Sequence, residues 1–196
     1  YYDKIVSEGN YDLDEYEAIW KSVAVVFDKI VPFDVVRGAR VLDLATGRGI
    51  VLTEAVRKGA SEVVGVDISK GMLNQAEAAL ARFDSPATVR LIEGDMFKLS
   101  ELLGTPEKEE DKFDIITISH VLLLYSKEEI VKLVSQARQF LKNNGYLVML
   151  FRTFDEENYS SRHGHEFTAE EYRDILNGIG FTQTGSIVAS EEMDSD

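Results

Sequence analysis

A short glycine-containing segment holds the residues that are best suited to bind a ligand. Asp43 and Ala45 lie at the end of an apolar run, and Thr46, Gly47 and Gly49 follow it before an amphipathic segment. Glycine has no Cβ, so a ligand can approach its backbone closely, and the free N–H groups at a helix start favour polar ligand groups. The segment therefore predicts a ligand-binding turn between a strand and a helix.

Two acidic residues downstream belong with this turn. Asp67 ends the next apolar run, and Asp95 follows Gly94 after the third one. In parallel α/β sheets the carboxyl ends of the strands share one edge, where an acid after the second strand binds ribose hydroxyls. A helix-capping role beside Ser69 is the structural alternative for Asp67. We expect both acids to face the same ligand as the turn.

The elements that must position these residues follow from the periodicity. Apolar runs rich in Val, Ile or Leu cover 40–45, 62–67, 88–92, 113–119 and 146–151, and helical spacing covers 12–31, 51–56, 70–83, 127–142 and 169–179. Strands that are apolar at nearly every position are covered on both faces. Alternating strands and helices predict an α/β fold, a doubly wound, mostly parallel sheet with helices on both faces. The polar segment 104–112 is expected to be a surface loop.

Local signals mark some of the helix ends. Ser126 with Glu129, and Thr168 with Glu171, have the spacing of a capping box, in which each side chain accepts a hydrogen bond from the other residue's backbone. Gly145 stands shortly after the segment 127–142 and predicts its end.

Composition excludes several classes of protein. The 196 residues carry a formal net charge of −14, which repels phosphate and argues against a nucleic-acid partner. There is no cysteine, which excludes disulfides, thiolate metal sites and a cysteine nucleophile, and is typical of the reducing cytoplasm. Apolar runs are far shorter than the ~20 residues of a membrane span, and no leader pattern is seen. The chain starts at Tyr1, so we expect some preceding sequence to be absent.

The motifs VLDLATGRG, VVGVDIS, EGDMF, FDIITISHVL and LKNNGYLVM occur in one order along the chain. Together they resemble the class I S-adenosylmethionine-dependent methyltransferases, over residues 37–151 and more loosely over 165–190. The resemblance implies a Rossmann-like methyltransferase fold and S-adenosylmethionine as the cofactor. The last, antiparallel edge strand of that fold is not evident in this sequence.

The resemblance also implies a role for individual residues. The turn with Ala45, Thr46, Gly47 and Gly49 would cradle the methionine part of the cofactor, although Ala45 replaces the family's usual first glycine. Other implied roles are orientation of the amino group by Asp43, binding of the ribose hydroxyls by Asp67, contact with adenine by Ile68, Asp95 and Met96, and lining of the site by Ser119.

Methyl transfer from a sulfonium is an in-line displacement with a neutral leaving group, so alignment supplies much of the rate and a base is needed only for some acceptors. His120 follows the fourth apolar run and is our candidate catalytic residue, with a merely lining role as the alternative. His163 and His165 lack a third ligand nearby, and we expect no metal site.

These observations predict one domain over residues 1–196, with an N-terminal helical lid (1–36), a cofactor-binding core (37–151) and a C-terminal flap, helix and strand (152–196). The missing cysteine and the absence of an Asp/Asn-Pro-Pro-aromatic motif argue against DNA methylation. We expect a small-molecule acceptor, as in the ubiquinone-biosynthesis-like group. A non-catalytic cofactor-binding or regulatory subunit is one alternative. A nicotinamide-dependent oxidoreductase is another, disfavoured because Leu52 replaces the third glycine. The oligomeric state is left open.

Overall fold

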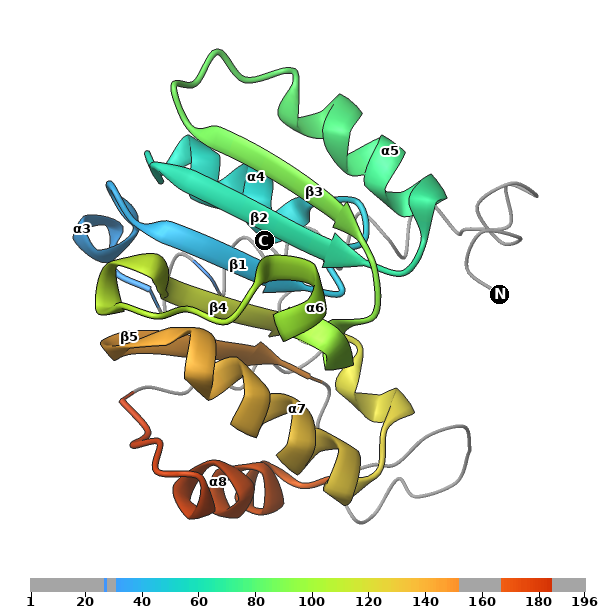
Figure 1. The fold of residues 1–196 in the computed structure, drawn as a ribbon, viewed down its shortest axis with the longest axis vertical. Coiled ribbons are helices and arrows are strands. Elements are labelled where there is room, and N and C mark those ends of the chain that lie inside the picture. The colour runs from blue at the N-terminus through green and yellow to red at the C-terminus, as the bar shows by residue number, and fades with distance from the viewer. Residues whose placement is uncertain (1–26, 28–30, 152–166, 185–196) are drawn as a thin grey trace, which may run out of the picture.

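A five-stranded parallel sheet forms the centre of the computed structural model, which describes residues 27, 31–151 and 167–184 (Figure 1). Its strands are β1 (Arg40–Leu44), β2 (Glu62–Asp67), β3 (Thr88–Glu93), β4 (Phe113–Ser119) and β5 (Leu141–Leu150). The order is β3-β2-β1-β4-β5 and every pair is parallel, so the direction of winding reverses between β1 and β4. This confirms the predicted α/β class. An antiparallel edge strand stays a prediction, because residues 185–196 lie outside the described part.

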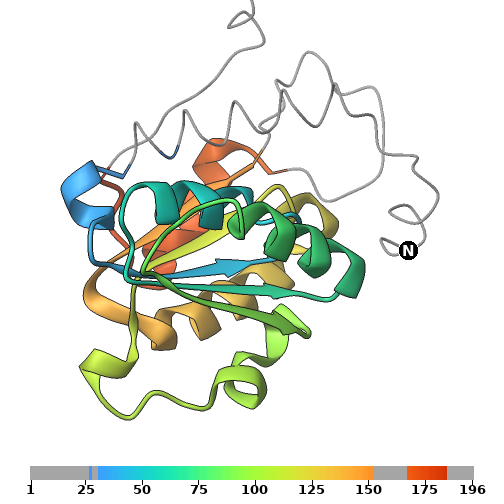
Figure 2. The same cartoon turned by 90° about the horizontal axis from the view of Figure 1, so that it is seen from above.

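Helices cover both faces of the sheet. They are α3 (Phe33–Val36), α4 (Ile50–Arg57), α5 (Lys70–Leu80), α6 (Leu99–Leu103), α7 (Lys127–Phe140) and α8 (Ala169–Gly178), with 3₁₀ turns η1 (Met96–Lys98), η2 (Glu109–Asp111) and η3 (Leu122–Leu124). Figure 2 shows α4 and α5 on one face of the sheet and α6 and α7 on the other. The sheet is therefore doubly wound, as expected.

Side chains that alternate along each strand build two cores. Successive residues of β1, β2 and β4 enter opposite clusters: Val41, Val63 and Ile115 pack on the α4 side, and Leu42, Val64 and Ile116 pack on the α7 side. All six are fully buried. Burial on both faces explains why these strands appear as nearly continuous apolar runs in the sequence.

The predicted helix starts are confirmed at both capping boxes. Ser126 Oγ accepts a hydrogen bond from Glu129 N at 3.3 Å and Glu129 Oε2 accepts from Ser126 N at 2.8 Å. Thr168 and Glu171 exchange the same pair of bonds at the start of α8. Capping of this kind satisfies backbone donors that a helix start otherwise leaves open.

Gly145 was predicted to end the helix 127–142, and this is wrong. The helix ends at Phe140 and β5 begins directly at Leu141, five residues before the predicted strand. Gly145 lies inside β5, where the register with β4 shifts. A Cβ there would come within 2.8 Å of Leu141 Cδ1 and 2.9 Å of the Asp114 carbonyl oxygen, so the glycine permits a close approach of the two strands.

Parts of the predicted organisation lie outside the described residues. These are nearly all of the predicted helix 12–31, which belongs to the proposed lid, and the flap over 152–166 with His163 and His165. Segment 104–112 is a largely exposed loop with the short turn η2, as expected. Among the helices of the described segments, none has the length and apolar character that crossing a bilayer requires.

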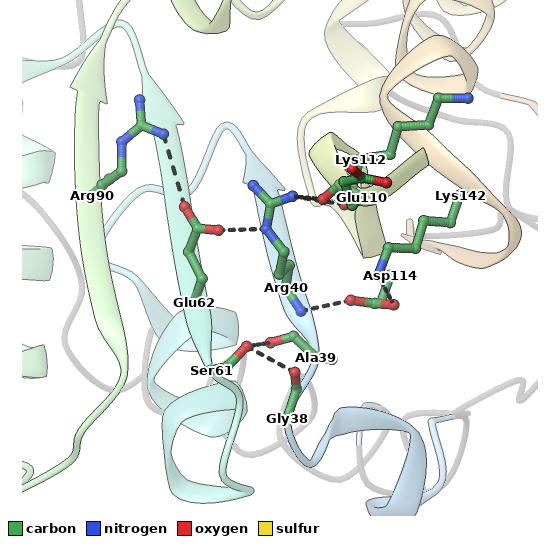
Figure 3. Close-up of polar contacts among 10 residues, drawn as sticks. All are labelled: Gly38, Ala39, Arg40, Ser61, Glu62, Arg90, Glu110, Lys112, Asp114 and Lys142. Atoms are coloured by element: carbon green, nitrogen blue, oxygen red, sulfur yellow. Dashed lines mark hydrogen bonds and ion pairs between the residues drawn. The ribbon is translucent and has the colours of Figure 1, made fainter. Parts of the chain in front are cut away.

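Paired charges close the amino end of the sheet (Figure 3). Arg40 Nε donates to Glu62 Oε2 at 2.5 Å, and Arg40 Nη1 donates to the carbonyl oxygens of Glu110 and Lys112. Asp114 accepts from the Arg40 backbone N–H at 2.9 Å and pairs with Lys142. These contacts tie β1, β2 and β4 to the 104–112 loop. A cavity of about 250 Å³ opens here beside Arg40.

Candidate functional site

The carboxyl ends of the parallel strands bring the predicted site residues to one edge. Leu44 on β1 is in register with Val66 on β2 and with Ile118 on β4, and Asp67 is in register with Glu93 on β3. The loops that follow these strands therefore leave the sheet on the same side. The predicted ligand residues lie here: in the turn after β1, at the last residue of β2, at the start of η1 and at the last residue of β4.

The turn after β1 has an unusual backbone. Ala45, Gly47 and Gly49 all have positive φ, at 56°, 52° and 76°. A left-handed conformation costs a residue with a Cβ about 1–2 kcal/mol, so the backbone at Ala45 is strained, and β1 ends at Leu44, one residue earlier than predicted. Thr46 anchors the turn, since its N–H donates to Val66 O at 3.0 Å and its carbonyl oxygen accepts from Gly49 N.

The two glycines of this turn do different things. Among the described residues, a Cβ on Gly47 would meet no atom within 4 Å, so this part of the structure leaves room for a ligand beside the Gly47 backbone. A Cβ on Gly49 would lie 2.9 Å from Ala76 Cβ on α5. Gly49 therefore permits close packing of α4 and α5, whereas Gly47 gives access to the backbone.

Asp43 is a buried carboxylate at the heart of this edge. It is 1% exposed, its Oδ1 accepts from Thr117 Oγ1 at 2.5 Å and its Oδ2 accepts from Thr46 Oγ1 at 2.7 Å. Burial raises the pKa of Asp43 to about 6, while the two hydroxyls lower this pKa and the charge of Asp67 raises it further. At pH 7 the group is mainly ionised and suits a cationic ligand group.

Asp67 joins the turn to the end of β2. Its Oδ2 accepts from Gly47 N at 2.8 Å and its Oδ1 accepts from Ser69 N at 2.9 Å, while Ser69 itself caps α5 by accepting from Met72 N. The structural alternative beside Ser69 thus holds in part. A carboxylate oxygen has more than one acceptor site, so Asp67 can still receive ligand hydroxyls. The neighbouring Ile68 is 68% exposed, an apolar surface that a flat ring can cover.

Asp95 and Met96 follow β3. Asp95 Oδ1 accepts from Phe97 N at 2.9 Å and caps η1. Met96 is 6% exposed and packs in the core on the α7 side. The apolar cluster beneath the loop takes most of its surface, and its expected contact with adenine stays a prediction.

Ser119 and His120 complete the edge at the end of β4. Ser119 Oγ and His120 Nδ1 are 2.9 Å apart, and the His120 N–H donates to Leu150 O of β5 at 2.8 Å. His120 has a φ of 54°, an uncommon conformation for a residue with a side chain. Its backbone is therefore fixed at the predicted edge, and its catalytic role stays a prediction.

Thr117, which donates to Asp43, is not a candidate from the sequence, where its only signal is a hydroxyl inside the apolar run 113–119. Tyr125 packs edge-on against Phe97 at 5.0 Å between ring centroids. Partial burial raises the pKa of Tyr125, and the charges of Asp95, Glu129 and Asp67 raise it further. Within the described ranges, no group of His, Asp and Glu side chains is arranged to hold a metal ion.

Comparison with known proteins identifies relatives of this chain. The sequence model of the family described as "Methyltransferase domain" matches residues 41–145. The ribosomal protein L11 methyltransferase of Pelobacter propionicus is 39% identical over 109 residues, which is 56% of this chain and 30% of that protein. The chain spans between 30% and 41% of the length of three curated relatives.

Solved structures share the fold. Magnesium protoporphyrin IX methyltransferase (ChlM) from Synechocystis PCC 6803 with bound SAH superposes with a TM-score of 0.65 at 19% identity, covering 85% of this chain and 74% of that one. The DhpI–SAH complex superposes with a TM-score of 0.68 at 19% identity, covering 92% of this chain and 84% of that one. At this identity the likeness establishes a shared fold.

Proposed function

The chain belongs to the methyltransferase domain family, and on that premise we propose that it transfers a methyl group from S-adenosylmethionine to a small-molecule acceptor. One observation carries the proposal. The buried carboxylate of Asp43 and the half-buried carboxylate of Asp67 flank Gly47, where a ligand can reach the backbone. Two acids beside an open glycine suit a ligand that combines a cationic amino acid part with ribose hydroxyls.

The residues fit this cofactor part by part. Asp43 would hold the amino group, the open backbone at Gly47 would face the methionine part, and Asp67 would accept from the ribose hydroxyls with its remaining lone pairs. Ile68 offers an exposed apolar surface for the adenine, with Asp95 nearby at the start of η1.

When bound, S-adenosylmethionine supplies an activated methyl group on a sulfonium. In the transfer, an electron pair of the acceptor would form the new bond to the methyl carbon, and the sulfur would keep the electron pair of the broken carbon–sulfur bond as a neutral thioether. The chain's own contribution is alignment of the reactants. Where the acceptor must lose a proton, His120 is the proposed base because it lies at the same edge.

The acceptor class is part of the proposal. The formal net charge of −14 disfavours a polyanionic acceptor. ChlM, which shares the fold, is named for a small molecule, whereas two curated relatives are named for a ribosomal protein and are matched over 30% and 38% of their length. The acceptor screen therefore also includes ribosomal proteins, to test the alternative of a protein acceptor. We also place the protein in the cytoplasm, in agreement with its lack of cysteine.

Calorimetric titration of one sample with S-adenosylmethionine, S-adenosylhomocysteine and NAD tests the cofactor. Binding of the first two without NAD is the expected result, and binding of NAD alone would favour an oxidoreductase. Release of S-adenosylhomocysteine is then measured with small amines, phenols and carboxylic acids as acceptors. Cofactor binding without turnover on any acceptor, ribosomal proteins included, would instead favour a regulatory subunit.

A further inference from the structure

Thr117 holds the buried acid from the neighbouring strand. It lies on β4 as the direct register partner of Asp43 on β1, and it is fully buried. Its hydroxyl donates to Asp43 Oδ1 at 2.5 Å, and the carbonyl oxygen of Leu42 is 3.4 Å away. Thr46 donates to the other carboxylate oxygen. The carboxylate is thus fixed between one hydroxyl from β4 and one from the turn.

We propose that Thr117 is a positioning residue for the cofactor, whose hydroxyl keeps the Asp43 carboxylate ionised and aligned at the carboxyl edge and so increases the affinity for the cofactor's amino group. This inference rests on the proposed function, because it assigns the amino group to Asp43. Thr117 itself acts through Asp43 and touches no reacting atom.

The physical reason is the cost of a buried charge. An ionised carboxylate removed from water is strongly disfavoured unless hydrogen-bond donors compensate it, and here two hydroxyls do so. The charge that acts on Asp43 from the described residues is that of Asp67, and it works against ionisation. Without the Thr117 hydroxyl, only the Thr46 hydroxyl would stabilise the ionised carboxylate, while burial and the negative charge of Asp67 would both disfavour ionisation.

The chain offers a matched control for a buried threonine. Thr53 on α4 is 2% exposed, and within the described residues its Oγ1 has no hydrogen-bond partner. Thr53→Val and Thr117→Val both replace a buried hydroxyl with a methyl group of similar size. Thr117→Ser keeps the hydroxyl and tests rescue. Thr117→Ala repeats the test if the valine variant does not fold.

Two measurements decide the inference. Carbon-13 NMR follows the titration of the Asp43 carboxyl in the cofactor-free protein, and calorimetry gives the affinity for S-adenosylhomocysteine at pH 7 and pH 8.5. In Thr117→Val we expect the titration midpoint to rise by about one pH unit, because a donor to the charged form is lost. We expect affinity to fall roughly three- to tenfold at pH 7, with partial recovery at pH 8.5.

Thr117→Ser should restore both quantities, and Thr53→Val should change neither. An unchanged midpoint and affinity in Thr117→Val would overturn the inference, and so would equal losses in Thr53→Val, which would assign the effect to packing. If the wild-type protein binds no S-adenosylhomocysteine, the proposed function and the affinity claim both fail. The NMR titration then still decides whether Thr117 keeps Asp43 ionised.

Discussion

Gly47, in the turn after β1, donates its backbone N–H to Oδ2 of Asp67, the last residue of β2, at 2.8 Å. The turn after β1 and the end of β2 are therefore joined by a carboxylate that also holds the Ser69 N–H before α5. Whatever binds Asp67 meets a turn that this same side chain has already oriented.

Replacing Asp67 by alanine should impair both binding and folding. Two backbone N–H groups lose their acceptor, so we expect the free energy of unfolding to fall by about 1–2 kcal/mol in urea denaturation. Loss of the ribose contacts should lower the affinity for S-adenosylhomocysteine, measured by calorimetry, at least about tenfold. Asp84→Ala, at an exposed site after α5, is the control and should change neither value. Full affinity in Asp67→Ala would remove this residue from the site.

Ala45→Gly should stabilise the protein. Ala45 has a φ of 56°, where glycine has no steric cost, and the gain should be up to about 1 kcal/mol after the greater freedom of glycine in the unfolded chain is subtracted. Thermal unfolding measures it. Ala78→Gly, on the exposed side of α5, should instead cost about 1 kcal/mol. A lower melting temperature for Ala45→Gly would contradict the described turn.

Alanine variants of Gly47 and Gly49 should have different effects, the first mainly on cofactor binding and the second mainly on stability. Gly47→Ala places a methyl group in open space, so we expect a stability loss of about 1 kcal/mol, from the positive φ, together with a clear loss of cofactor affinity. Gly49→Ala should cost about 2–4 kcal/mol, because its Cβ would also press on Ala76. Denaturation and calorimetry on both variants provide the comparison, and equal stability losses would refute this division of roles.

Asp43→Asn should raise stability near neutral pH while it weakens cofactor binding. The pKa of about 6 in the folded protein lies above the ordinary value of 3.8, so the ionised group lowers stability as the pH rises through the window from about 4 to 6. At pH 7 the variant should be more stable by about 1–3 kcal/mol, and near pH 4, where the carboxyl is protonated, the difference should vanish. Melting temperatures from pH 4 to pH 8 measure this. If the difference in stability between Asp43→Asn and the wild-type protein is independent of pH, ionisation of the buried Asp43 carboxyl is not its cause.

The sequence was sufficient for the elements whose signal is local. The bounds of β2 and β4 agree with the predicted apolar runs, and both capping boxes form as expected, because burial on two faces and backbone donors at helix starts depend on neighbouring residues. The same is true of the edge that holds Asp43, Asp67 and Asp95, since parallel strands place their carboxyl ends together.

Features that depend on distant contacts could not be predicted. The sequence predicts a helix end at Gly145, whereas the structure shows that Gly145 allows Leu141 of β5 and Asp114 of β4 to approach closely. The packing of Met96 in the core beneath η1 depends on distant residues and has no signal in the sequence. Thr117 was missed because its function depends on its register partner Asp43 on another strand.

The pairing of Asp43 on β1 with Thr117 on β4 also affects when the site can form during folding. The hydrogen bond between Thr117 and Asp43 spans 74 positions of the chain, and two other strands lie between them in the sequence. Closing so long a loop is entropically unfavourable, so contacts of this kind form late compared with local helices. A folding intermediate that contains β1, β2 and β3 would carry the turn and Asp67 but leave Asp43 without its partner. The cofactor would then bind only after β4 has paired with β1, so its binding energy would stabilise that strand pairing.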